Sequence, residues 1–360
     1  MLHYLKDTEH PNLQHITSLQ RIDKTDHLWM DRFTIRNLEL LGGVESNNSL
    51  LKVLDNTQSP MGARLLKRWT IMPLTDINKI EERQNLVEYF IKSPEERNKI
   101  AQCIKQAGDI ERLVSKIPLK KINPREVLQI ARGLKLVSQV KETCDASANE
   151  YLKRLGDSLN PCKYISDKIF KEIIENPPVA ASKGNIIAEG VNVTLDDLKN
   201  IVTNGKGHLL KLQQQEIEST GISSLKIGFN NVFGYYLEVT HTHKEKVPGT
   251  WMRKQTLTNA ERYITPELKE YEEKITGAED KILQLELEIF ERLLNELQDY
   301  IAPMQLNGHV LAVLDCLICF SNNALQFKYK KPFLHNRYEL ELKNSRHPVI
   351  ERNLPQGESY

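Results

Sequence analysis

The chain has 360 residues, of which 27% are charged. This composition is typical of a water-soluble globular protein and argues against a membrane protein. The formal net charge is only +1, so any affinity for a polyanion must come from a local concentration of basic side chains. The length predicts two or three domains.

The sequence shows no signal for export or membrane insertion. The N-terminal segment MLHYLKDTEH lacks the apolar core of a secretory signal, and no uninterrupted run of about 18 apolar residues follows it. The five cysteines are scattered and odd in number, which is typical of reduced thiols. Cys316 and Cys319 form a C-x-x-C pair inside an apolar helical run, where burial is a better interpretation than metal binding. We therefore expect a cytoplasmic protein that has no membrane contact and no metal site.

The first half of the chain reads mainly as helices. Residues 15–41 look like short strands that lead into a helix starting near Asn48–Leu54. From there to about Phe170 the pattern is helix after helix, interrupted by prolines. The segment INKIEERQNLVEYFI, for example, has the three-to-four spacing of apolar residues that favours an amphipathic helix. An α-helical core is expected.

Two long helices are predicted farther along the chain. The first begins at Thr194, whose hydroxyl can cap its first turn, and continues to Gly221. The second begins at Thr265 and Pro266, a cap followed by proline at the first helical position, and continues to about Tyr300. Its apolar residues alternate spacings of four and three over more than three heptads, which favours packing along a partner helix. The two helices would form an antiparallel arm.

Residues 222–258, between these helices, read as a small β element. Apolar side chains occupy alternate positions, as in Leu225, Ile227 and Phe229. Turns at Asn230-Asn231 and at Pro248-Gly249 would separate about three antiparallel strands. The predicted fold is therefore mainly α, with a helical core and a long antiparallel helix pair that carries a small antiparallel β domain at its tip.

Basic side chains gather on this β element. Between Ser223 and Arg262 the sequence has six basic and three acidic residues, a local charge of +3. Such donors suit the phosphate backbone of nucleic acid, which is bound without sequence preference. The alternative is a basic loop that is only solvated. His241 and His243 would share one face of a strand, but the neighbouring lysines disfavour a metal ion there.

No catalytic constellation is recognisable. None of the 17 glycines belongs to a G-x-x-x-x-G-K-[ST] loop, and the nearest lookalike, NGKG at residues 204–207, lies inside the first long helix. Neither G-x-S-x-G nor H-E-x-x-H is present. The sequence thus predicts no enzyme activity, no catalytic residue and no cofactor for this chain.

Several long segments resemble the MutS family of DNA mismatch-recognition proteins. The run FNNVFGYYLEVTHTHKEKVP, followed by MRKQTLTNAERYITPELKEYEEKI, resembles the clamp and the descending lever helix of that family. SPMGARLLKRWTIMPLTDINKIEERQNLVEYF resembles its core signature, and ENPPVAASKGNIIAEGVNVTLDDL resembles the passage from core to ascending lever. NSRHPVIERNLP resembles the first strand of its ATPase domain. The similarity covers nearly all of the chain.

The resemblance implies a division of the chain and a set of phosphate contacts. The implied segments are residues 1–14, the end of a connector domain; 15–205, core and ascending lever; 206–265, clamp; 266–335, descending lever and return to the core; and 336–360, the start of an ATPase domain. The implied DNA-binding residues are Lys226, Asn230, Arg253, Lys254, Asn259 and Arg262. Thr258 stands where some relatives carry lysine, so a contact there would be weaker or absent. The aromatic residues interpreted as clamp core, not as base-stacking groups, are Phe233, Tyr235, Tyr236 and Trp251.

The family also implies a function. Lever and clamp would bind the backbone of double-stranded DNA non-specifically during DNA mismatch repair. The complete protein would be a DNA-dependent ATPase that uses ATP and Mg²⁺, forms a homodimer and binds MutL. This chain resembles a middle portion of such a protein, because Phe170–Glu172 matches the mismatch-reading F-x-E only inside a helical stretch and the chain reaches Tyr360 before any Walker A sequence. The alternative is a structural coiled-coil arm that docks a repair partner protein.

Overall fold

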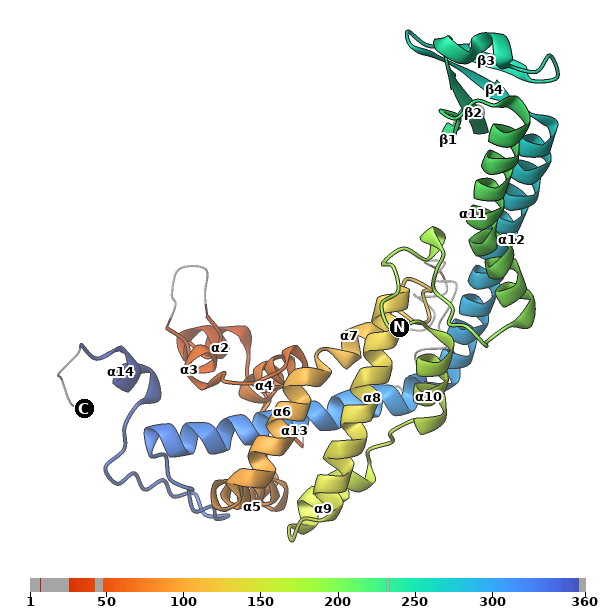
Figure 1. Ribbon diagram of the computed structural model, residues 1–360. Coiled ribbons are helices and arrows are strands. Elements are labelled where there is room, and N and C mark those ends of the chain that lie inside the picture. The colour runs from red at the N-terminus through yellow and green to blue at the C-terminus, as the bar shows by residue number, and fades with distance from the viewer. Residues whose placement is uncertain (1–6, 8–25, 43–47, 231, 233, 356–360) are drawn as a thin grey trace. The chain divides into compact units, whose positions relative to one another are not determined.

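The computed structural model describes residues 7, 26–42, 48–230, 232 and 234–355 (Figure 1). The chain divides into two compact units. The core unit comprises the described residues of Met1–Phe170 and Leu294–Tyr360, and the arm unit comprises those of Lys171–Leu293. The core unit is mainly helical, whereas the arm unit combines two long helices with a four-stranded sheet, so the predicted fold class is confirmed.

The core unit is built around the apolar helix α13 (Ile301–Phe327). This helix packs against α4, α5 and α7, and α8 packs against α6 and α9. The other helices of this unit are α2 (Arg32–Asn37), α3 (Leu50–Leu54), α4 (Pro60–Ile71), α5 (Ile77–Lys92), α6 (Pro94–Ala107), α7 (Ile110–Val114), α8 (Pro124–Asp145), α9 (Glu150–Asp157), most of α10 (Lys163–Glu172) and α14 (Pro348–Asn353).

Cys316 and Cys319 are buried on α13, and burial raises the pKa of both thiols. The C-x-x-C pair is thus part of the core, as the sequence predicts.

A buried carboxylate fixes the start of α4. Asp315 on α13 accepts hydrogen bonds from Gln58 N at 2.8 Å, Ser59 N at 2.8 Å and Ser59 Oγ at 2.7 Å. The same Ser59 Oγ accepts from Gly62 N at 3.0 Å and thereby caps α4. A Cβ at Gly62 would overlap the Asp315 carboxylate. The SPMG sequence therefore supplies a cap, a proline at the first helical position and a glycine where the two helices approach closely.

Two expectations about regular structure in the core unit are wrong. Within residues 26–41 there is no strand but helix α2, which Asp31 caps by accepting from Thr34 N at 2.7 Å. The β-branched residues of this segment favour a strand only weakly, and the local cap favours the helix. NSRHPVIERNLP contains helix α14, with Pro348 at its first position, and not a strand. Of the expected connector end, residues 1–14, only Asp7 is described, and residues 8–25 and Tyr360 lie outside the described residues.

One helical stretch of the described chain is apolar enough for a membrane span. It lies within Pro266–Phe327, and 67% of it is buried inside the protein. Burial of this extent is typical of a core helix in a globular protein. The stretch is therefore accounted for by the core that surrounds α13.

The first long helix of the arm unit is α11 (Val193–Thr220). Its cap is Asn192 and not Thr194, because the Asn192 side-chain oxygen accepts from Leu195 N at 3.0 Å. Both residue types are good caps, and the sequence alone does not decide between two candidates so close together. The helix ends at Gly221, as predicted, with a φ of 67° that glycine adopts readily.

The second long helix is α12 (Pro266–Leu297), and it begins where the sequence predicts. Thr265 Oγ1 caps it by accepting from Leu268 N at 3.2 Å, and Pro266 occupies the first helical position. Leu268 packs in the same cluster as Leu212 of α11. The start of α12 therefore lies beside the later turns of α11 (Figure 1).

A buried ion pair joins the two helices near the start of α11. Glu286 of α12 is fully buried, and its Oε1 lies 2.7 Å from Lys199 Nζ of α11. The same oxygen accepts from the backbone N–H groups of Ile186 at 3.3 Å and Ile187 at 3.4 Å. Because Leu212 and Leu268 also share one apolar cluster, this pairing makes α11 and α12 antiparallel, which confirms the predicted arm.

The sheet between the helices has four strands in the order β1-β2-β4-β3, and all neighbouring pairs are antiparallel. The strands are β1 (Lys226–Asn230), β2 (Gly234–Thr240), β3 (Met252–Thr256) and β4 (Ala260–Ile264). The sequence predicts about three strands and misses β4, because two charged residues interrupt its apolar pattern. His241 and His243 are not on a strand but in the 3-10 helix η2 (His241–Lys246), so the expected shared strand face does not exist.

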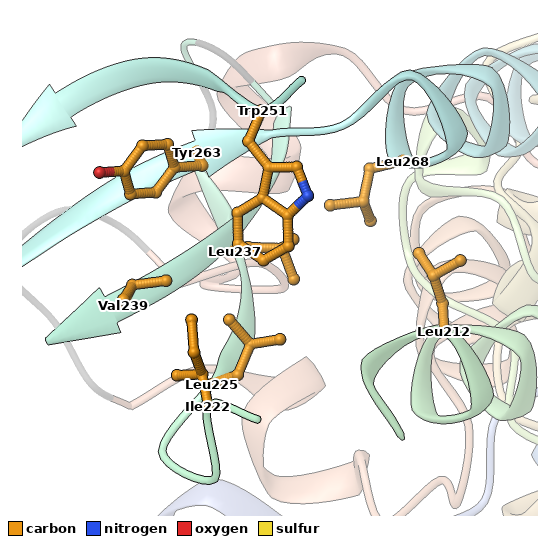
Figure 2. Packing of buried hydrophobic residues seen from close by; sticks show 8 residues of the cluster. All are labelled: Leu212, Ile222, Leu225, Leu237, Val239, Trp251, Tyr263 and Leu268. Carbon is orange, nitrogen blue, oxygen red and sulfur yellow. The ribbon is translucent and has the colours of Figure 1, made fainter. Parts of the chain in front are cut away.

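One face of this sheet packs against the ends of the two helices (Figure 2). Leu237 of β2 and Tyr263 of β4 belong to the same apolar cluster as Leu268 of α12, and Trp251 lies between Tyr263 and Leu268. Leu212 of α11 lies on the same side of the cluster as Leu268, and the ring of Trp251 lies 6.0 Å from that of Tyr263. The apolar face of a single sheet must be buried against another element, so this cluster fixes the sheet to the helix pair.

The Glu286 pairing is testable by stability measurements. Glu286→Ala should lower the free energy of unfolding of the arm unit by about 2–4 kcal/mol, because two buried backbone N–H groups and Lys199 lose their acceptor. Amide hydrogen exchange at Ile186 and Ile187 should accelerate accordingly. Glu288→Ala, which removes an exposed carboxylate from the same helix, is the matched control. Equal exchange in both variants would contradict the assignment.

Candidate nucleic-acid interface

The strand register places Lys226, Glu238, Arg262 and Gln255 in one row across the sheet. Arg262 Nε donates to Glu238 Oε2 at 3.1 Å, and Arg262 Nη1 donates to Gln255 Oε1 at 2.9 Å. The Arg262 guanidinium carbon lies 4.3 Å from the ring centroid of Tyr236. Only 20% of the Arg262 side chain is exposed. Arg262 is thus held within the sheet, whereas Lys226 at the end of the row is exposed.

Arg253 lies on the opposite face from Arg262. It pairs with Tyr263, and successive residues of a strand point to alternate faces. Its Nη1 lies 3.6 Å from Oε1 of Glu261, and Lys244 Nζ lies 2.9 Å from the same oxygen. The Tyr263 hydroxyl donates to the other carboxylate oxygen, Oε2. The predicted contacts Arg253 and Arg262 therefore do not form one surface.

The charge state of this group follows from its hydrogen bonds. The bonds from Tyr263 and from Lys244 lower the pKa of Glu261 to about 2. Burial, together with the bond to the Glu261 carboxylate, raises the pKa of Tyr263 to about 12. Near neutral pH the carboxylate is ionised and the phenol keeps its proton. With Lys244 and Arg253 both cationic, the group carries a net charge of +1.

Lys254 and Asn230 line one open cleft of about 650 Å³ near the ends of β1 and β3. Lys269 of α12 also lines this cleft. Lys254 lies at a β-bulge of β3 and is exposed. Asn230 Oδ1 accepts from Val232 N at 2.8 Å, so its side chain helps to form the turn after β1. The structure thus brings these two predicted contacts together.

Asn259 lies in the turn between β3 and β4. Its carbonyl accepts from His241 N at 3.3 Å, and His241 Nε2 donates to the Leu257 carbonyl at 3.0 Å. These bonds hold η2 against the turn and leave the Asn259 side chain exposed. Within the described residues no group of three or more metal-ligating side chains occurs.

The aromatic side chains of this region are mostly internal. Trp251 and Tyr236 are buried, and Tyr235 is partly buried with its ring 5.9 Å from that of Tyr271. Phe233 lies outside the described residues. Phe229 is exposed, with its ring 5.0 Å from that of Tyr235. The buried rings of the described part stabilise the sheet, as the sequence analysis expects of clamp core residues.

Sequence reasoning missed Lys244 as a member of the site. Lys244 contributes to the local charge, but its partner Glu261 is 17 positions away and in a strand that was not expected. One signal could have revealed it. If AERYI is aligned as a strand, Glu261 shares a face with Tyr263, so a carboxylate points toward the apolar side and needs basic partners.

These features define a mainly helical protein in which a long antiparallel helix pair carries a basic β domain. A family model described as MutS domain III matches residues 33–321. This match covers most of the chain. The chain belongs to the MutS domain III family.

Curated relatives match over the whole chain. DNA mismatch repair protein MutS of Parabacteroides distasonis is 50% identical over 361 residues, that of Flavobacterium johnsoniae is 51% identical and that of Phocaeicola vulgatus is 49% identical. In each case the match covers 100% of this chain and 42% of the relative. The chain therefore spans less than half of the length of these relatives.

Acid should weaken the sheet through Glu261. The pKa of this carboxyl is about 2 in the folded protein against an ordinary 4.5, so its stabilising effect is complete above about pH 4.5 and is lost as the pH falls toward 2. Hydrogen exchange of the β4 amides, corrected for its intrinsic pH dependence, should therefore accelerate over this range more in the wild type than in Glu261→Gln. All other carboxyl groups are the same in the two proteins, so their contributions to acid sensitivity cancel in the comparison. The same acid sensitivity in both would contradict this role for Glu261.

Proposed function

We propose that the arm unit binds the phosphate backbone of double-stranded DNA without reading its sequence. The relatives that match this chain are named DNA mismatch repair proteins, and the name identifies DNA as the molecule on which they act. The sheet and η2 carry a local excess of positive charge on a chain that is almost neutral. Phosphate contacts position a protein on a duplex and carry no sequence information directly.

One observation carries this proposal. Cationic side chains of the β domain are exposed, among them Lys226, Lys254 and Arg253, while Trp251 and Tyr236 are buried. Single-strand binding by base stacking needs exposed rings next to the basic groups, whereas backbone binding needs only the cations. Phe229 is the exception, because the residue is 58% exposed and lines the same cleft as Lys254, with its ring 5.0 Å from that of Tyr235. One exposed ring among several exposed cations still favours duplex backbone contact over base stacking. Arg262, which is held by partners inside the sheet, contributes chiefly to its stability.

We propose a wider role for the longer protein by analogy with the same relatives. It would be a DNA-dependent ATPase of mismatch repair that uses ATP and Mg²⁺, works in the cytoplasm as a homodimer and binds MutL. The present chain would contribute the lever and the clamp and would itself hydrolyse no ATP and bind no cofactor. It has no G-x-x-x-x-G-K-[ST] loop to hold a nucleoside triphosphate. The six predicted DNA contacts remain candidates, with Lys226, Lys254 and Arg253 the most accessible.

Salt dependence tests the backbone contacts. Affinity for a plain duplex should fall steeply as salt rises, and Lys226→Ala or Lys254→Ala should each reduce the slope of log K against log salt by roughly 0.9. The loss should be the same for unrelated sequences. Lys99→Ala in the core unit also removes an exposed lysine and is the matched control. Slopes unchanged in the two arm variants would favour docking of a partner protein instead.

Mismatch discrimination is the second test of this function. Because backbone contacts carry little sequence information, the chain should bind a G·T duplex and its matched control with nearly equal affinity. The measurement is a competition titration at constant salt. A reproducible preference of about tenfold, or roughly 1.4 kcal/mol, for the mismatched duplex would show that the chain reads bases.

A further inference from the structure

Glu261 is an acidic side chain at the centre of a basic region. It lies on β4 with 2% of its surface exposed, on the sheet face that Tyr263 shares. A carboxylate in such a place is unfavourable unless it is paired and hydrogen-bonded. Its presence therefore calls for an explanation beyond the filling of a strand position.

Three partners from three different segments meet at this carboxylate. Lys244 comes from η2 and approaches Oε1 to 2.9 Å, and Arg253 comes from β3 and approaches the same oxygen to 3.6 Å. Tyr263 donates its hydroxyl to Oε2. Tyr263 is itself part of the apolar cluster under the sheet. The cluster thus orients the phenol, the phenol orients the carboxylate, and the carboxylate orients the two cations.

The two cations remain available to a ligand. The exposed fractions of their side chains are 54% for Lys244 and 58% for Arg253, against 3% for that of Glu261. Lysine has three N–H donors and arginine has five, so most of their donors stay unused by Glu261. Both charged groups contact one oxygen atom, which keeps them close together in spite of their mutual repulsion.

The segment that carries Lys244 is also fixed. His241 N donates to the Asn259 carbonyl at 3.3 Å, and His241 Nε2 donates to the Leu257 carbonyl at 3.0 Å. These two bonds tie η2 to the β3–β4 turn. Lys244 therefore starts from a defined backbone position, although it is an exposed lysine of a connecting segment.

We propose that Glu261 is a positioning residue that holds Lys244 and Arg253 as one preorganised pair for a DNA phosphate. The inference rests on the proposed backbone-binding function and adds Lys244 to its contacts. Without the carboxylate, two flexible side chains would have to be ordered at the moment of binding, and that ordering lowers affinity.

The inference makes a prediction opposite to that of simple charge counting. Glu261→Gln removes a negative charge near the phosphates, so long-range electrostatics alone would tighten binding. Loss of the preorganised pair should instead weaken binding to a plain duplex by about three- to tenfold at roughly 0.1 M salt. The direction of the change separates the two accounts.

Glu245→Gln is the matched control. Glu245 is exposed on η2 next to Lys244, so the same chemical change there removes a negative charge without disturbing the pair. Its affinity should stay equal or rise slightly. In a Lys244→Ala background, Glu261→Gln should have a smaller effect than in the wild type, because the two side chains act together.

The outcomes separate this inference from the function on which it rests. If the wild type binds duplex with a steep salt dependence but Glu261→Gln binds equally or more tightly, the positioning role is wrong and backbone binding stands. If the wild type shows no salt-dependent binding, both are wrong. Circular dichroism and β4 hydrogen exchange report whether Glu261→Gln folds. Should it not fold, Lys244→Ala decides, since an unchanged affinity and salt slope in that exposed-site variant would overturn the pair.

Discussion

The apolar cluster between the sheet and the two helix ends is the constraint on which the arm unit depends. The apolar face of a single sheet must be buried against another element, and Leu237, Tyr263 and Trp251 share one cluster with Leu212 and Leu268 of the helices. Burial of side chains of this size is worth roughly 1.5–3 kcal/mol each. The cluster lies on the sheet face that also carries Glu261. What the sheet can offer a ligand is therefore its turns, the polar row on its other face, and the exposed Lys244 and Arg253 that Glu261 holds.

The ion pairs of the sheet are placed by the strand order and by the face on which each side chain lies. Glu238 and Glu261 occupy interior strands and each holds an arginine, but the two pairs lie on opposite faces. Arg262 lies deep between Glu238 and Gln255, so its charge serves the sheet. Arg253, on the edge strand β3, keeps most of its surface in solvent. Position in the sheet, more than residue type, therefore decides which cations are free to meet a phosphate.

The sequence predicts the long elements well and the short ones poorly. The position of α12 is predicted from the capping pair Thr265 and Pro266 and from the heptad repeat that follows. The cap and the repeat both indicate a helix over the same residues. β4 and α2 were misassigned for opposite reasons. β4 has two charges that only its cross-strand partners accommodate, and α2 has β-branched residues but a capping aspartate. For β4, contacts outside a short window outweigh local propensity, whereas for α2 a local cap outweighs it.

The candidate site was predictable as a region but not as a geometry. Counting charges between Ser223 and Arg262 identifies the basic domain. It cannot show that Arg262 is occupied by Glu238 or that Lys244 and Arg253 share Glu261, since these partners are apart in sequence. Strand register, which depends on the whole sheet, supplies that information.

Hydrogen exchange with and without a plain duplex tests the central claim most directly, because it locates the bound surface on the intact chain. The account predicts slower exchange in η2, β3 and the β3–β4 turn on addition of DNA, and no change in the core helices α8 and α13. Salt that releases the duplex should remove the protection. Protection confined to the core unit, or no protection anywhere in the arm unit at saturating DNA, would contradict the assignment of the β domain as the DNA-binding surface.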